Sequence, residues 1–99
     1  MAAELIISNN EKTLHFETLL GKGNSAFIEY RWHQGNLALM HTFVPESFEG
    51  KGIAASLTKF VLEYAREKAL KIIVYCLYIS AYLKKHPEYQ ELVKTTHLT

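Results

Sequence analysis

The first half of the chain consists of short runs in which apolar and polar residues alternate, separated by turn-forming residues. Leu5 to Ile7 is a short apolar run that stops at Ser8-Asn9-Asn10, a cluster of turn formers. Alternation then extends from Leu14 to Thr18 and from Ala26 to Trp32, and glycine-containing turns follow both runs. A period of two is typical of half-buried strands, and short turns join antiparallel neighbours. The pattern therefore predicts an antiparallel meander.

The run from Leu37 to Val44 is different, because apolar residues occupy both its odd and its even positions. A strand that lacks a polar face is typical of the middle of a sheet covered on each side. Regular alternation would place His41 on the same face as Leu37 and Leu39, and Thr42 on the opposite face. We therefore expect a central strand with His41 turned toward one of the two covering layers.

Beyond this strand the period changes from two to three and four residues. This spacing predicts one long amphipathic helix over 51–69, with an apolar stripe that packs on the sheet. The apolar, β-branched run Lys71–Cys76 predicts a strand parallel to Leu37–Val44, since strand, helix and strand form a right-handed crossover. Tyr78–Lys85 and the segment after Pro87 complete the chain as a short C-terminal helical segment.

Composition narrows the class of protein. The 99 residues are 48% hydrophobic and 21% charged, which favours one globular α+β domain over 1–99. A formal net charge of +1 argues against nucleic acid and against a membrane surface as partners, and no apolar run approaches the roughly 20 residues that span a bilayer. The single cysteine, Cys76, excludes an internal disulfide framework. With no basic, apolar leader at the N-terminus, a cytoplasmic protein is expected.

The junction between the central strand and the long helix contains two glycines, Gly50 and Gly52, around Lys51. Glycine lets a backbone approach a ligand closely, and the N–H groups and dipole of a helix start attract anions. The junction is therefore a candidate pyrophosphate site, although an ordinary strand–helix turn is the better explanation of the glycines taken alone. The glycine spacing matches neither a Walker loop nor a dinucleotide fingerprint.

Two separated blocks of the sequence resemble one protein family. The segment 41–45 (HTFVP) followed by 50–54 (GKGIA) is similar to the acetyl-CoA loop of the GNAT superfamily of N-acetyltransferases. The later segments 76–79 (CLYI) and 85–89 (KHPEY) resemble a block of its small, stand-alone members. The resemblance covers Leu5 to Val93 and implies a single GNAT-like domain in which the two central parallel strands part to admit the pantetheine arm of acetyl-CoA.

Mapped by this resemblance, the pantetheine pairs with the strand backbone and the pyrophosphate lies over the helix start. The cofactor-binding residues it implies are Phe43, Val44, Gly50, Lys51, Gly52, Ile53, Ala54 and Ala55. Glu49 departs from the family pattern, which usually has Gln or Arg at this position. A carboxylate beside a pyrophosphate is unfavourable unless it turns away.

Two side chains are candidates for catalysis at the reactive end of the cofactor. Cys76 precedes a helix start and is a candidate nucleophile, and His41 is a candidate general base toward an amine or toward Cys76. Direct transfer and an acetyl-Cys76 intermediate are both open. So are an inert buried thiol and a hydrogen-bonded core histidine. Tyr78 is a weaker candidate as proton donor to the departing CoA thiolate, and no cluster has metal-ligand spacing.

The leading hypothesis is an acetyltransferase that moves an acetyl group from acetyl-CoA to a primary amine of a small molecule or a protein. The alternative is a non-catalytic CoA-binding module or sensor. A third class is a small interaction domain that pairs through an exposed strand edge, for which a second copy of the chain is one partner. The chain is short relative to larger GNAT enzymes, so a shallow or partner-completed acceptor site is expected.

Overall fold

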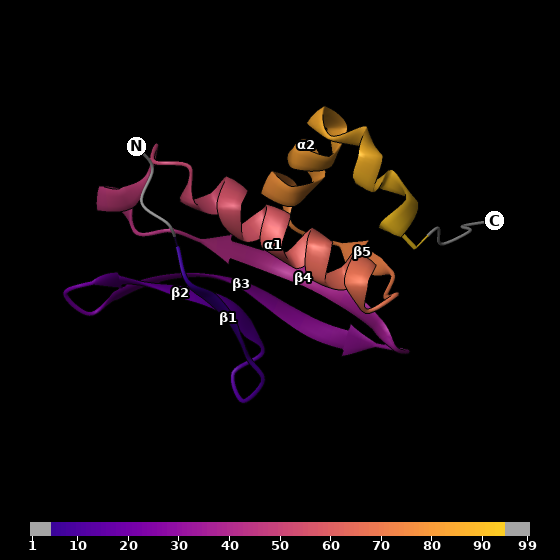
Figure 1. Cartoon of the computed structure of the whole chain (residues 1–99), viewed down its shortest axis with the longest axis horizontal. Helices are drawn as coiled ribbons and strands as arrows, with labels where there is room; N and C mark the ends of the chain where they lie inside the picture. The colour runs from indigo at the N-terminus through magenta and orange to yellow at the C-terminus, as the bar shows by residue number, and fades with distance from the viewer. Residues whose placement is uncertain (1–4, 95–99) are drawn as a thin grey trace.

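The computed structural model describes residues 5–94. A five-stranded sheet has the order β1-β2-β3-β4-β5, and helices cover one of its faces (Figure 1). The strands are β1 (Ile7–Asn10), β2 (His15–Gly21), β3 (Asn24–His33), β4 (Asn36–Phe43) and β5 (Ile72–Val74). The first four strands pair antiparallel and β4 pairs with β5 in parallel. The predicted meander and parallel crossover are therefore confirmed.

The first turn lies later in the chain than the sequence pattern predicts. Ser8, Asn9 and Asn10 belong to β1 and pair with β2, so the prediction that they form a turn is wrong. The side chain of Asn10 instead stabilises the turn that follows the strand, because its Oδ1 accepts hydrogen bonds from the backbone N–H groups of Lys12 and Thr13. A short polar side chain stabilises a following turn in this way without itself leaving the strand.

The helices follow the predicted order. They are η1 (Glu46–Phe48), α1 (Ile53–Glu67), α2 (Leu77–Lys85) and η2 (Pro87–Leu92), where η marks a 3-10 helix. Helix α1 is shorter than the predicted 51–69, because Gly52, with φ 80°, is its N-cap and Lys68 its C-cap. Figure 1 shows α1 running across the sheet, with α2 and η2 on the same side.

The core lies between α1 and the sheet face that α1 covers. Its largest fully buried side chains are Phe16, Ile28, Tyr30, Leu37, Leu39, Leu57, Val61, Leu62, Ile72 and Ile79. The opposite face of the sheet carries exposed Arg31, His41 and Phe43. The prediction that β4 is covered on both faces is therefore wrong, since the helices pack on one face only.

A β-bulge in β4 reverses the expected facing of its second half. Glu29 of β3 lies opposite His41 and Tyr30 lies opposite Leu39, so Met40 is an extra residue without an opposite partner. Beyond the bulge, Thr42 lies opposite the buried Ile28. The prediction that His41 shares a face with Leu37 and Leu39 is thus wrong. One extra residue moves every later side chain of a strand to the other face.

The parallel pairing of β4 with β5 is short. It ends at Leu39 opposite Val74, with a last hydrogen bond from the Tyr75 N–H to the Leu39 carbonyl at 3.0 Å. Strand β4 continues to Phe43, whereas the segment that follows β5 leaves the sheet and enters α2. The predicted strand over Lys71–Cys76 is too long, because Cys76 is already the N-cap of α2. The two strands therefore part, as the family resemblance implies.

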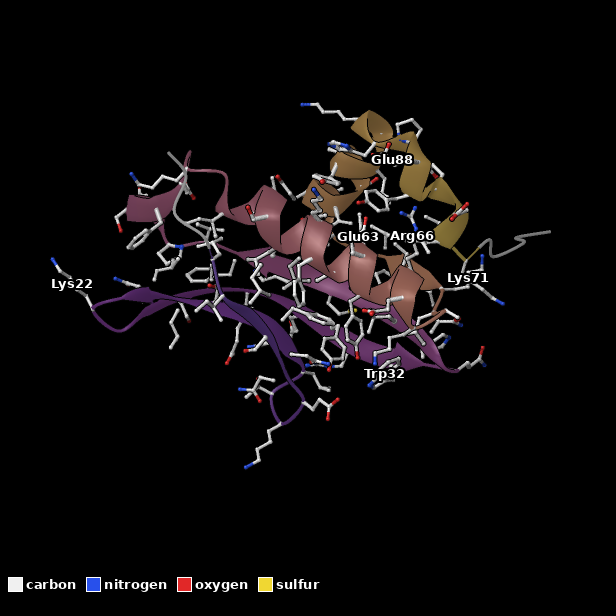
Figure 2. All side chains as sticks on the ribbon, in the orientation of Figure 1. Lys22, Trp32, Glu63, Arg66, Lys71 and Glu88 are labelled. Atoms are coloured by element: carbon white, nitrogen blue, oxygen red, sulfur yellow. The ribbon has the colours of Figure 1, made fainter. Side chains whose placement is uncertain are left out.

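The C-terminal segment is fastened to α1 by polar contacts. Tyr89 donates its hydroxyl proton to Glu63 Oε2, and the Arg66 guanidinium donates to the Glu88 carbonyl at 2.9 Å. Figure 2 shows Glu63 and Arg66 on the side of α1 that faces this segment. Arg66 also lies over the Tyr89 ring, 4.8 Å from its centroid. These contacts, with buried Tyr89 and Leu92, hold η2 against the helix layer.

Candidate functional site

A cavity of about 630 Å³ opens where the end of β4, the η1 loop, the start of α1 and α2 meet. It is lined by His41, Thr42, Phe43, Val44, Phe48, Glu49, Gly50, Gly52, Ile53, Ala54, Ala55 and Tyr78. The structure thus brings together seven of the eight predicted cofactor-binding residues, and Lys51 is the exposed exception between the two glycines. The cavity lies beyond the last pairing of β4 with β5.

The loop before α1 depends on glycine for its backbone shape. Gly50 and Gly52 have φ values of 81° and 80°, in the left-handed region that L side chains rarely adopt. An added Cβ at either position would meet nothing within 4 Å, so the requirement comes from the backbone and not from crowding. The glycines therefore set the direction in which the chain enters the helix.

The start of α1 presents backbone donors. The first bond of the helix runs from the Ser56 N–H to the Gly52 carbonyl at 3.0 Å, so the N–H groups of Ile53, Ala54 and Ala55 have no acceptor within the helix. Gly52 has no side chain to cap them. With the dipole of a 15-residue helix behind them, these groups favour an anion at this end of the cavity. Glu49 lines the same cavity and opposes that preference.

The thiol of Cys76 lies behind the cavity wall. Cys76 is 8% exposed, and its Sγ is 3.2 Å from Thr42 Oγ1. Thr42 lines the cavity and Cys76 does not, so the sulfur is next to the cavity through its contact with Thr42. The sequence analysis did not identify Thr42, because regular alternation placed it on the far face of β4. The one signal available was that Thr42, with His41, is one of two polar residues in the run Leu37–Val44.

His41 lies on the open face of the sheet and also lines the cavity. It is exposed, and within residues 5–94 no hydrogen bond joins it to Cys76. Next to it on the same face the rings of His15, Phe27 and Phe43 form a row, with centroids 4.0 Å and 5.4 Å apart. The two candidate catalytic side chains thus belong to the same end of the sheet but to different faces of β4.

Tyr78, the second residue of α2, also lines the cavity. Partial burial raises the pKa of its hydroxyl above the ordinary value, and the charge of nearby Cys76 raises it further, although the residue as a whole is 41% exposed. Tyr78 therefore stays protonated at neutral pH. The phenol thus has a proton to donate into the cavity, although the raised pKa makes it a weaker acid.

Residues 5–94 contain no group of three or more His, Cys, Asp or Glu side chains that could hold a metal ion. None of the helices over the same residues is long and apolar enough to span a membrane.

The comparisons with known proteins agree with this geometry. The sequence model of the family described as GCN5-related N-acetyl-transferase matches residues 15–92. Protein NATD1 of Xenopus tropicalis is 43% identical over 88 residues, which cover 87% of this chain and 81% of the relative. Protein NATD1 of Danio rerio is 29% identical over 99 residues, or 98% and 90% of the two chains.

The fold has a counterpart among solved structures. The solution structure of a GCN5-like protein from Staphylococcus aureus, proposed to be an N-acetyltransferase, superimposes with a TM-score of 0.72 at 31% identity. The match covers 95% of this chain and 92% of that one. The family match spans both strands that part, the glycine loop and Cys76. The chain belongs to the GCN5-related N-acetyltransferase family.

Proposed function

We propose that the chain is an acetyltransferase that moves an acetyl group from acetyl-CoA to a primary amine. One observation carries this proposal: a single cavity joins the unpaired end of β4 to the N-terminus of α1. Such a cavity offers backbone groups to a long, flexible arm at one end and an anion site at the other. Acetyl-CoA has the matching parts, a pantetheine arm and a pyrophosphate.

The pyrophosphate end is supported by the loop and the helix start. The N–H groups of Ile53, Ala54 and Ala55 would donate to phosphate oxygens, and the left-handed glycines would let the phosphates approach the backbone. Lys51, exposed beside the cavity, adds positive charge. The pantetheine amides would pair with the backbone of Phe43 and Val44, because β4 has no β5 partner beyond Leu39.

Two chemical routes use this placement. In the covalent route Cys76 loses its proton to His41 or to water, and its sulfur bonds to the acetyl carbon as the bond to the CoA sulfur breaks. The CoA thiolate takes a proton from Tyr78. The amine then bonds to the acetyl carbon, the bond to Cys76 breaks, and the amine's surplus proton leaves to a base or to water. In the direct route the amine attacks acetyl-CoA itself, and His41 or water takes that proton.

Ligand binding is the first test. CoA at 100 times its dissociation constant stabilises a protein by about 2.7 kcal/mol, which raises the Tm of a domain of this size by about 10–20 °C. No shift at millimolar CoA would refute both the acetyltransferase and the CoA-binding alternative, and would leave the interaction domain.

Mass spectrometry after mixing with acetyl-CoA separates the remaining hypotheses. An adduct of about 42 Da on the wild type, absent from Cys76→Ala, supports the covalent route. Acetylation of a test amine without an adduct supports direct transfer, and His41→Ala should then slow the reaction about 100-fold. Binding without adduct or product would identify a CoA-binding module instead.

A further inference from the structure

We propose that Thr42 is a positioning residue for Cys76: its hydroxyl holds the sulfur at the cavity wall and donates a hydrogen bond to the thiolate. This inference rests on the proposed function, since it assumes that Cys76 is the nucleophile. The contact that carries it is the 3.2 Å separation of Thr42 Oγ1 and Cys76 Sγ.

The backbone brings these two groups together by a specific irregularity. Met40 is the extra residue in β4, and the bulge turns Thr42 toward the helix side, opposite Ile28. In a regular strand the hydroxyl would lie on the open face, away from α2. Bulges often redirect a side chain next to an active site. The position of the Thr42 hydroxyl therefore follows from the one extra residue that β4 has relative to β3.

The contact also spans the place where the sheet separates. Backbone pairing between β4 and the following chain ends at Leu39, three residues before Thr42. Cys76 is likewise beyond the end of β5, at the N-cap of α2. The Oγ1–Sγ contact thus links β4 to the start of α2 at a point where β4 and β5 no longer pair. A small displacement of a reacting atom is costly in rate, so a link of this kind has a direct use in catalysis.

The direction of the hydrogen bond follows from the chemistry of the sulfur. A thiol is a weak donor and a weak acceptor, so in the resting protein either atom can donate. The reactive thiolate has no proton left, and the hydroxyl must then be the donor. Hydrogen bonds to a charged group are stronger than those between neutral groups. A threonine hydroxyl is not a base, so the proton of the thiol leaves to another acceptor, and Thr42 holds the sulfur that remains.

Two variants isolate the hydroxyl. Thr42→Val keeps the branched shape and removes the hydroxyl, and Thr42→Ser keeps the hydroxyl and removes the methyl group. Thr18→Val serves as the control, because Thr18 is a buried threonine of the same sheet face, on β2, whose hydroxyl has no hydrogen-bond partner among residues 5–94.

Two measurements are made on each variant. The first is the infrared S–H stretching band, which reports only Cys76 because the chain has one cysteine. The second is the single-turnover rate of the acetyl adduct on Cys76, followed by mass spectrometry, with the affinity for CoA measured separately.

We expect Thr42→Val to move the S–H band and to slow adduct formation about tenfold or more, at unchanged CoA affinity. Thr42→Ser should keep the wild-type band and recover most of the rate, and Thr18→Val should change neither. An unchanged rate in Thr42→Val, or a rate that Thr42→Ser fails to recover, would overturn the positioning role while the acetyltransferase stands. A wild type that binds CoA but forms no adduct would overturn the covalent route, and the role of Thr42 with it.

Discussion

Replacing Gly52 by alanine should weaken CoA binding far more than its effect on stability explains. Gly52 has φ 80° and an added Cβ meets nothing within 4 Å, so the cost to the folded protein is that of the backbone conformation alone. A left-handed L-residue costs about 1–2 kcal/mol, which lowers the Tm by about 4–16 °C for this size of domain. Relaxation of that strain would turn the N–H groups of Ile53 and Ala54 away from the phosphates. Each charge-assisted hydrogen bond lost weakens binding about 10- to 100-fold.

The chain offers a matched control in Gly35, which lies in the turn between β3 and β4. Its φ is also 80°, a Cβ there also meets nothing within 4 Å, and it is not part of the cavity. Gly35→Ala and Gly52→Ala should therefore lose similar stability in urea or thermal unfolding. Calorimetric titration with CoA should separate them, with affinity lost only in Gly52→Ala. Equal CoA affinity of the two variants would refute the assignment of the loop to the pyrophosphate.

Three further outcomes follow from the structure. Glu49→Gln should tighten CoA binding in the same titration, because it removes a carboxylate from the cavity lining, whereas Glu46→Gln, outside the lining, should not. The pKa of Tyr89 is raised from an ordinary value of 10.0 to about 12, mainly by its hydrogen bond to Glu63 and secondly by burial. The stability that this hydrogen bond contributes is therefore complete below pH 10 and lost as the pH rises toward 12, and urea unfolding of Tyr89→Phe against the wild type should show a difference that shrinks over that range. Deleting Met40 should leave the fold intact by circular dichroism, because the ladder becomes regular with every side chain on its present face, whereas deleting the buried Ala38 from the regular part of β4 should unfold the protein. An unfolded Met40 deletion would contradict the assigned register.

The elements were predictable wherever the hydrophobic period was long or the turn chemistry unambiguous. The apolar stripe of α1 repeats over four turns, and only a helix buries such a stripe. The glycine turn before β3 also lies where the sequence places it, since Lys22 and Gly23 both adopt positive φ. The end of β1 was less predictable. Asparagine favours turns, but Asn9 pairs with Phe16 and accepts the Tyr30 hydroxyl proton at 2.7 Å.

The site was predictable as a backbone feature and not as a set of side-chain contacts. Gly50 and Gly52 mark a loop with positive φ, which only glycine adopts easily, so their types reveal their conformation. The contact between Thr42 and Cys76 has no such signature. It depends on where β4 stops pairing with β5 and on which residue of β4 is extra, and cross-strand packing determines both.

The bulge decides which of two adjacent polar residues enters the crowded side of the sheet. Neighbours in a strand face opposite ways, so either His41 or Thr42 must point toward the helices. Without the extra Met40, the imidazole and not the hydroxyl would lie opposite Ile28, next to Cys76. With the bulge, the small hydroxyl takes that place and contacts the sulfur, while His41 lies exposed on the open face. A single extra residue thus decides that the hydroxyl, and not the imidazole, contacts the sulfur.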